Sequence, residues 1–145
     1  MKTNGGFLVT KIKQLGDRIF ERILAEKNID AFNGAQGRIL YVLWQEDGVP
    51  IKIISEKSGL AITSLTTMLE RMEKNGLISR KTDEADKRKT LLFLTDKAKE
   101  LKEAYDFVSN EMGNIYYRDF TDKEILQFEE YLNRIRVNLE EWSDK

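Results

Sequence analysis

The sequence has no cysteine, no histidine and a single proline among its 145 residues. Without cysteine the chain can form no disulfide, no thiol redox sensor and no thiolate metal site. Without histidine it lacks the commonest transition-metal ligand and the commonest general base. These absences exclude most metalloenzymes and triad hydrolases, so we expect a protein that is not an enzyme and holds no cofactor.

Long apolar runs are also missing from the chain. None approaches the ~20 residues that a membrane-spanning helix needs. The first residues, MKTNGGFLVTKIK, contain no apolar core of signal-peptide length. We therefore expect a cytoplasmic protein without a membrane partner. The composition, 41% hydrophobic, is sufficient for the core of a single domain of this length.

Helical periodicity dominates the first part of the chain. Apolar residues recur every three or four positions over residues 8–24, which predicts an amphipathic helix. Asn33 and Gln36 have the spacing of a capping box and predict a second helix that extends to Trp44.

Two short helices around a glycine are predicted next. Residues 51–57 form the first, and Gly59 suits the left-handed backbone that follows a helix. The second begins near Thr63 or Ser64 and ends before Gly76. A helix, a glycine-containing turn and another helix in so short a segment indicate a helix-turn-helix.

The periodicity then changes to that of a β-hairpin. Residues 77–81 and 89–94 are compatible with strands, and the charged segment 82–88 is compatible with the loop between them.

Two long helices are predicted at the end of the chain. The first is capped by Thr95 and extends to Ile115, and a capping box of Thr121 and Glu124 opens the second. Their apolar residues alternate steps of three and four, which is typical of helices packed side by side. Packing within the chain is one explanation of this pattern, and a subunit interface is the other. The interface is favoured because a winged helix-turn-helix needs only the middle of the chain. The residues expected in a dimer interface are Leu8, Ile12, Ile125, Phe128, Leu132, Ile135 and Leu139.

Charge is distributed unevenly along the chain. Residues 52–90 carry nine basic and six acidic side chains, a net of +3, although the whole chain has a net charge of −1. The positive segment coincides with the predicted helix-turn-helix and hairpin, where a nucleic-acid backbone would bind.

The exposed face of the helix that precedes Gly76 is rich in small hydroxyl residues. Such side chains let a helix approach the floor of the DNA major groove and can bond to base edges or phosphates. Plain surface positions and helix capping are the alternative explanation. The residues expected to contact DNA are Thr63, Ser64, Thr66, Thr67, Arg71, Lys74, Arg80, Lys87 and Arg88.

Arg88 and Asp86 form a distinct pair within the hairpin loop. A guanidinium at a hairpin tip can enter the minor groove, where the negative potential is strongest. Asp86 is expected to hold that arginine extended through a charge-assisted hydrogen bond. A surface ion pair without function is the alternative.

The hairpin and its surroundings resemble the wing signature of MarR-family transcriptional regulators. Upstream, the segment from Asn33 to Leu43 is similar to the second helix of that family. The residues that carry the resemblance of the wing are Gly76, Leu77, Ile78, Ser79, Arg80, Lys81, Asp83, Asp86, Lys87, Arg88, Leu94, Thr95, Ala98 and Leu101.

The resemblance implies a mainly α fold: a single domain over residues 1–145 with a winged helix-turn-helix and a short β-hairpin wing. Residues 33–94 would form the DNA-binding lobe, and residues 1–30 and 95–145 the dimerisation helices. It also implies a homodimer that binds double-stranded DNA at a pseudo-palindromic operator, commonly as a repressor. In this reading the helix around 63–74 is the recognition helix, Arg88 contacts the minor groove and Asp86 supports it.

Family members are commonly released from DNA by a ligand, and the missing residue types limit which one. Oxidant sensing through cysteine and zinc sensing through histidine are excluded, which leaves a small aromatic or amphipathic effector or no ligand at all. Arg38, Tyr41 and Trp44, with Leu15 and Ile19, could line a pocket, but we interpret them as core residues and assign no ligand site. The alternative functions are a winged-helix protein-interaction module and a ligand-sequestering protein without specific DNA binding.

Overall fold

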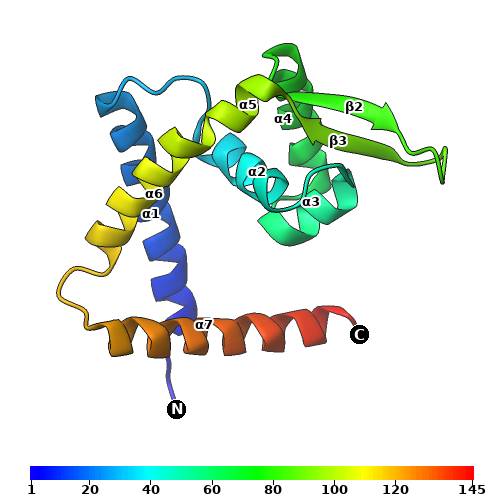
Figure 1. Cartoon of the computed structure of the whole chain (residues 1–145). Helices are drawn as coiled ribbons and strands as arrows, with labels where there is room; N and C mark the ends of the chain where they lie inside the picture. The colour runs from blue at the N-terminus through cyan, green and yellow to red at the C-terminus, as the bar shows by residue number, and fades with distance from the viewer. The chain divides into compact units, whose positions relative to one another are not determined.

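A computed structural model describes residues 1–145 and is shown in Figure 1. The chain forms two compact units, residues 1–110 and 111–145, each described by itself. No helix is both long enough and apolar enough to cross a bilayer. The elements are α1 (Gly5–Glu26), α2 (Gly34–Gln45), β1 (Val49–Pro50), α3 (Ile51–Ser58), α4 (Ile62–Lys74), β2 (Ile78–Thr82), β3 (Thr90–Leu94), α5 (Asp96–Glu100), α6 (Lys102–Tyr116) and α7 (Asp122–Ser143).

The helix-turn-helix consists of α3 and α4, and local hydrogen bonds define the turn between them. Gly59 adopts φ +75°, a left-handed conformation that a side chain would strain. Its amide donates to the Ser55 carbonyl at 3.0 Å, and the Ser55 hydroxyl donates to the Leu60 carbonyl at 2.7 Å. The turn is therefore closed on both sides of the glycine, as the sequence predicted.

The wing is a three-stranded antiparallel sheet in the order β1-β3-β2. Ile78 is paired with Leu94 at one end of the hairpin, and Thr82 with Thr90 at the other. Figure 1 shows β2 and β3 extending beyond the helices of this unit to a bare loop. Strand β1 was not predicted, because two residues that include a proline carry no periodicity.

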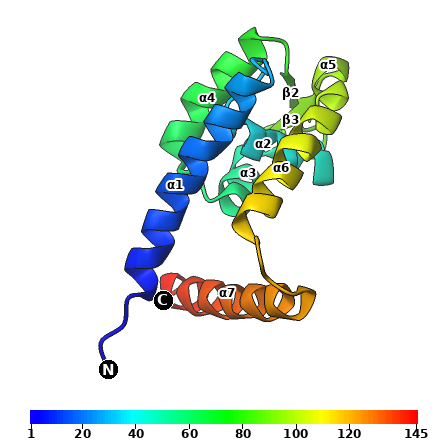
Figure 2. The ribbon, with the colours of Figure 1, turned by 90° about the vertical axis from the view of Figure 1, so that its left-hand side faces the viewer.

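An aliphatic core fixes the helix-turn-helix to the base of the wing. Helix α4 turns its apolar side inward, while α1 buries only its C-terminal residues Ile23 and Leu24. Figure 2 shows the N-terminal part of α1 extending away from α4. Burial of this kind stabilises by about 25 cal/mol per Å² of apolar surface. The largest fully buried side chains are Ile39, Leu40, Leu43, Ile54, Leu65, Leu69, Met72, Leu77, Leu92 and Val108.

The prediction of one uninterrupted helix from Thr95 to Ile115 is wrong, because the chain breaks at Leu101 between α5 and α6. Thr95 caps α5 as expected, accepting a hydrogen bond from the Ala98 amide. The Ala98 carbonyl accepts from the Leu101 amide at 3.1 Å and from the indole of Trp44 at 3.2 Å. These two donors take the carbonyl that a continuous helix would use one residue later.

The second unit consists of the end of α6 and the long helix α7. Thr121 and Glu124 form the predicted capping box at the start of α7. The Tyr117 hydroxyl donates to the Glu129 carboxylate at 2.7 Å, and its ring lies 6.2 Å from that of Phe128. No residue of α7 is fully buried, so the apolar side of this helix is incompletely covered by the chain itself.

Candidate nucleic-acid interface

Helix α4 begins close to the predicted position. Its first residue is Ile62, preceded by Ala61 in extended backbone, and no side chain caps it. Thr63 and Ser64 lie near the start of the helix, as predicted, but neither caps it, so capping does not explain these hydroxyl residues. The first-turn amides of α4 lack a side-chain acceptor, which makes this end of the helix favourable for an anion.

The predicted contact residues of α4 all lie on its exposed surface. Its second half adds two positive charges to the hydroxyl groups of the first two turns. The Thr66 hydroxyl donates to the Ile62 carbonyl at 3.0 Å, so its proton is used within the helix. The exposed residues are Thr63, Ser64, Thr66, Thr67, Arg71 and Lys74.

Arg80 lies on β2 and is fixed beside α4 by an ion pair. Its Nε atom is 3.2 Å from a carboxylate oxygen of Glu73, and about a third of the Arg80 side chain is exposed. Exposed ion pairs of this kind contribute little stability, on the order of 0–1 kcal/mol. The pair nevertheless orients the guanidinium next to the exposed surface of the helix.

Asp86 accepts hydrogen bonds from Arg88 at the tip of the hairpin. The Arg88 Nε and one terminal nitrogen lie 3.0 and 3.2 Å from the two carboxylate oxygens of Asp86. The Arg88 amide also donates to Asp86 at 3.1 Å. These hydrogen bonds from Arg88 lower the pKa of Asp86, and the carboxylate in turn raises the pKa of Arg88.

The bidentate geometry leaves the guanidinium accessible. The Arg88 side chain is 91% exposed, whereas that of Asp86 is 28% exposed. A fork-to-fork contact restricts the rotamers of a long side chain without covering it. The arrangement agrees with the support that the sequence predicted for Arg88.

The hairpin loop itself is ordered by its own polar groups. The amide of Asp83 donates to the Lys89 carbonyl, and the amide of Lys89 donates to the Asp86 carbonyl, both at 3.0 Å. The Asp83 carboxylate accepts from the Ala85 amide at 2.9 Å. The neighbouring Lys87 is exposed. These hydrogen bonds therefore fix the backbone of the loop, while its basic side chains Lys87 and Arg88 remain exposed.

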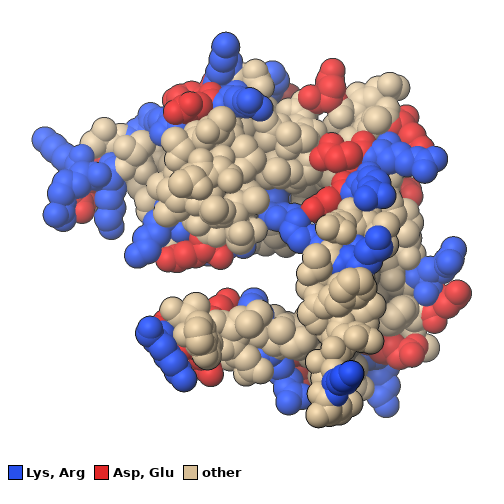
Figure 3. Space-filling view, turned by 180° about the vertical axis from the view of Figure 1, so that it is seen from behind, with Lys and Arg blue, Asp and Glu red and all other residues tan.

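An open cleft of about 780 Å³ lies between the hairpin, the start of α3 and Thr66 of α4. Basic side chains outnumber acidic ones around it, with Glu56 the one acidic residue of its lining. Lys and Arg side chains gather at the end of the molecule that carries the hairpin (Figure 3). Such a cleft suits a polyanion such as a nucleic-acid backbone. Its basic residues are Lys52, Arg80, Arg88 and Lys89.

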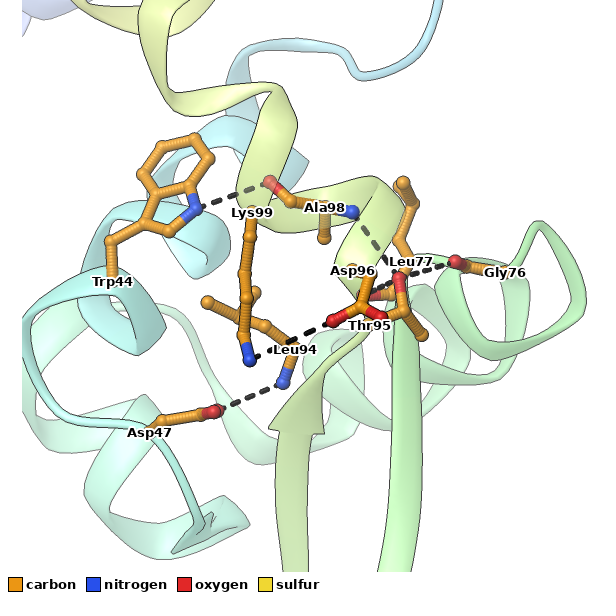
Figure 4. A network of polar contacts seen from close by, with 9 residues as sticks. All are labelled: Trp44, Asp47, Gly76, Leu77, Leu94, Thr95, Asp96, Ala98 and Lys99. Atoms are coloured by element: carbon orange, nitrogen blue, oxygen red, sulfur yellow. Dashed lines mark hydrogen bonds and ion pairs between the residues drawn. The ribbon is translucent and has the colours of Figure 1, made fainter.

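A polar network joins the base of the wing to the neighbouring helices (Figure 4). The Thr95 hydroxyl donates to the Gly76 carbonyl at 2.6 Å, just beyond the end of α4. The Asp47 carboxylate accepts from the Leu94 amide at 2.8 Å, next to α2. The network therefore links the base of the wing to the loop after α2, to the end of α4 and to α5.

Tyr105 of α6 is the centre of an aromatic cluster that the sequence did not predict. Its ring lies 5.3 Å from Trp44 and 5.8 Å from Tyr41, and also contacts Phe20 and Phe32. Burial is the main cause that raises the pKa of Tyr105. Tyr41 and Trp44 both pack against Tyr105, but Trp44 is half-buried and Tyr41 is 46% exposed, so the interpretation of Tyr41 as a core residue is wrong. Their common partner was missed because the rings come from distant segments.

The residues expected in the dimer interface are exposed or half-buried. In the first unit, Leu8 and Ile12 are exposed; in the second, Ile135 and Leu139 are 49% and 66% exposed. No cluster of acidic side chains in the molecule could hold a metal ion. The half-buried residues of α7 in this set are Ile125, Phe128 and Leu132.

Sequence comparison identifies relatives of part of the chain. The MarR family matches residues 32–90. The HTH-type transcriptional regulator TtmR of Methylorubrum extorquens is 36% identical over 77 residues, which are 53% of this chain and 40% of TtmR. The organic hydroperoxide resistance transcriptional regulator of Bacillus subtilis is 42% identical over 64 residues, 44% of each chain. The match therefore spans less than half the length of each of these curated relatives.

Solved structures extend the similarity to nearly the whole fold. A MarR family regulator from Listeria monocytogenes, determined in complex with a 26mer DNA, superposes with a TM-score of 0.82 at 22% identity. The alignment covers 96% of this chain and 90% of that one. The relatives found by sequence are transcriptional regulators rather than enzymes. Residues 32–90 therefore match the MarR family, and the chain has the winged helix-turn-helix fold of MarR-type regulators.

Proposed function

We propose that this protein is a cytoplasmic, homodimeric transcriptional repressor that binds double-stranded DNA. The observation that carries the proposal is the exposed Arg88, held by both oxygens of Asp86 at the tip of a wing beside the hydroxyl-rich surface of α4. An ordered but uncovered arginine is what minor-groove insertion requires. The MarR family matches residues 32–90, and the relatives found by sequence are regulators, which supports the same function.

In this proposal α4 lies in the major groove and the wing in the adjacent minor groove. The hydroxyl residues of α4 contact base edges, and Arg71 and Lys74 contact phosphates at its other end. The basic cleft accommodates the backbone between the two grooves, with Arg80 and Lys87 neutralising phosphates on either side. Each of these contacts would release counterions, which makes binding strongly salt-dependent.

A homodimer explains the uncovered apolar side chains of α1 and α7. Exposed residues such as Leu8 and Leu139 would be covered by a second copy of the chain. Large exposed apolar patches are uncommon on monomers. A two-fold dimer would present two lobes to half-sites one helical turn apart (~34–36 Å), so the operator would be pseudo-palindromic.

An aromatic or amphipathic small molecule is the effector class that the chain supports best. The cluster around Tyr105 offers several ring faces, and Arg38 lies beside it with a terminal nitrogen 3.7 Å from Asp17. Trp44 belongs both to this cluster and to the network at the base of the wing. A ligand that displaces these rings would therefore alter the position of the wing and weaken DNA binding.

Selection of bound duplexes from a randomised pool tests the proposed function. We expect enrichment of a pseudo-palindrome, and an affinity for it that falls log-linearly with salt concentration. A pool without an enriched sequence would contradict the proposal. Weak, sequence-independent binding would favour a ligand-sequestering protein, and capture of a partner protein with little salt dependence would favour an interaction module.

A further inference from the structure

Ile62 is an exposed apolar residue at the start of the surface proposed to face DNA. It is the first residue of α4 and is 47% exposed, whereas Leu65 and Leu69 of the same helix are fully buried. Single exposed isoleucines are ordinary on protein surfaces. The position of this one is informative because the N-terminal residues of a recognition helix contact the base edges.

Thr66 extends the apolar surface of Ile62 by one turn. Residues four apart on a helix are neighbours, and the Thr66 hydroxyl donates to the Ile62 carbonyl at 3.0 Å. Because its proton is used in this way, Thr66 offers a base a methyl group and an acceptor oxygen but no donor. The helix carries no charged residue before Glu70. Ile62 and Thr66 therefore form a strip of methyl groups, which we call the methyl strip.

The methyl strip lies next to the cationic part of the candidate interface. Thr66 lines the same cleft as Arg80 and Arg88. A duplex held by those arginines would bring its major-groove edge to the start of α4. The apolar group that this edge displays is the 5-methyl of thymine.

We propose that Ile62, together with the methyl group of Thr66, reads the 5-methyl group of a thymine in each operator half-site. This inference rests on the proposed DNA-binding function. It assigns a sequence preference to a residue that the hydroxyl and charge patterns of the sequence did not reveal. Contact between apolar side chains and this methyl group is a recognised form of direct readout.

Replacing thymine by deoxyuridine tests the inference, because the exchange removes only the methyl group and keeps every base-pairing atom. Duplexes of the selected operator would carry deoxyuridine at one thymine position of both half-sites at a time. Their affinities would be measured by fluorescence anisotropy with the full chain. We expect one position to weaken wild-type binding by roughly 3- to 5-fold per half-site, the magnitude of burying one methyl group.

Ile62→Ala provides the other arm of the cycle. The variant should lose a similar factor on the thymine operator and should no longer distinguish thymine from deoxyuridine at that position. Ile62→Val, which shortens the side chain by one carbon, should retain part of the discrimination. Affinity for random-sequence duplex and the thermal unfolding curve should stay unchanged in both variants, which separates this role from a structural one.

The outcomes distinguish failure of this inference from failure of the proposed function. If a motif is enriched but no deoxyuridine position weakens binding, the methyl readout is wrong and DNA binding stands. The same follows if Ile62→Ala remains as sensitive to deoxyuridine as the wild type. If no sequence is enriched at all, the proposed function is wrong and this inference falls with it.

Discussion

Asp86 is an acidic residue that we expect to favour DNA binding through its contact with Arg88. A carboxylate near the phosphates should weaken DNA binding by repulsion, yet Asp86 holds Arg88 extended through two hydrogen bonds to its guanidinium. We predict that Asp86→Asn weakens specific binding by roughly 3-fold or more, because it weakens the charge-assisted hydrogen bonds that hold Arg88. Fluorescence anisotropy with the selected operator measures the effect.

Asp83→Asn is the matched control for this prediction. Asp83 lies in the same loop, and its carboxylate accepts from the Ala85 amide rather than from an arginine. The substitution removes the same charge, so general electrostatics predicts equal or tighter binding. If Asp86→Asn also binds more tightly than the wild type, the supporting role of Asp86 is refuted.

The elements at the base of the wing depend on the Thr95 hydroxyl. It caps α5 and donates to the carbonyls of Gly76 at 2.6 Å and Leu77 at 3.2 Å, so Thr95→Val removes the cap and this shared donor while keeping the shape of the side chain. We predict a loss of about 1–2 kcal/mol in the free energy of unfolding. Urea denaturation at a fixed protein concentration measures it.

Thr10→Val serves as the comparison for Thr95→Val. The Thr10 hydroxyl donates only to the Gly6 carbonyl one turn earlier in α1, on an exposed surface. Its replacement should change the free energy of unfolding by less than about 0.5 kcal/mol. Equal losses in the two variants would show that the network at the base of the wing adds no stability of its own.

Local signals predicted most of the elements, and contacts between distant segments account for the misses. The capping boxes at Asn33 and Thr121 involve residues three apart, so the sequence alone predicts them. The break at Leu101 is not, because its cause is the Trp44 indole that binds the Ala98 carbonyl from another helix. Strand β1 likewise exists only through its pairing with β3.

The candidate site shows the same division between local and distant information. The spacing of Asp86 and Arg88 was sufficient to predict their contact, because two residues in one loop form it. Ile62 was overlooked because the start of α4 was predicted near Thr63 or Ser64, which left Ile62 outside the helix. Tyr105 acquires its role only from four rings that three other segments of the sequence supply.

At the scale of the whole molecule, the exposed apolar side of α7 predicts a dimer. A single charge placed on this side should dissociate that dimer. Ile135 is 49% exposed in the single chain, so Ile135→Asp leaves the fold of the protomer intact. An unpaired carboxylate in an apolar interface should weaken association by at least about tenfold. Light scattering at low micromolar concentration measures the mass.

Asn133→Asp adds the same charge to α7 outside the apolar series. Asn133 is exposed and its side chain accepts a hydrogen bond from Arg136, so this variant should keep the dimeric mass. A dimer that survives Ile135→Asp would contradict the assignment of this face to the subunit interface.

The central claim, that the wing reads DNA through Arg88, is tested most directly by the affinity of Arg88→Ala for the selected operator. Arg22→Ala is the control, since it removes the same charge from an exposed ion pair with Glu26 on α1. We predict that Arg88→Ala weakens specific binding by roughly tenfold, consistent with 1–3 kcal/mol for an arginine contact, while Arg22→Ala changes it little. Equal affinities of Arg88→Ala and the wild type would contradict the account.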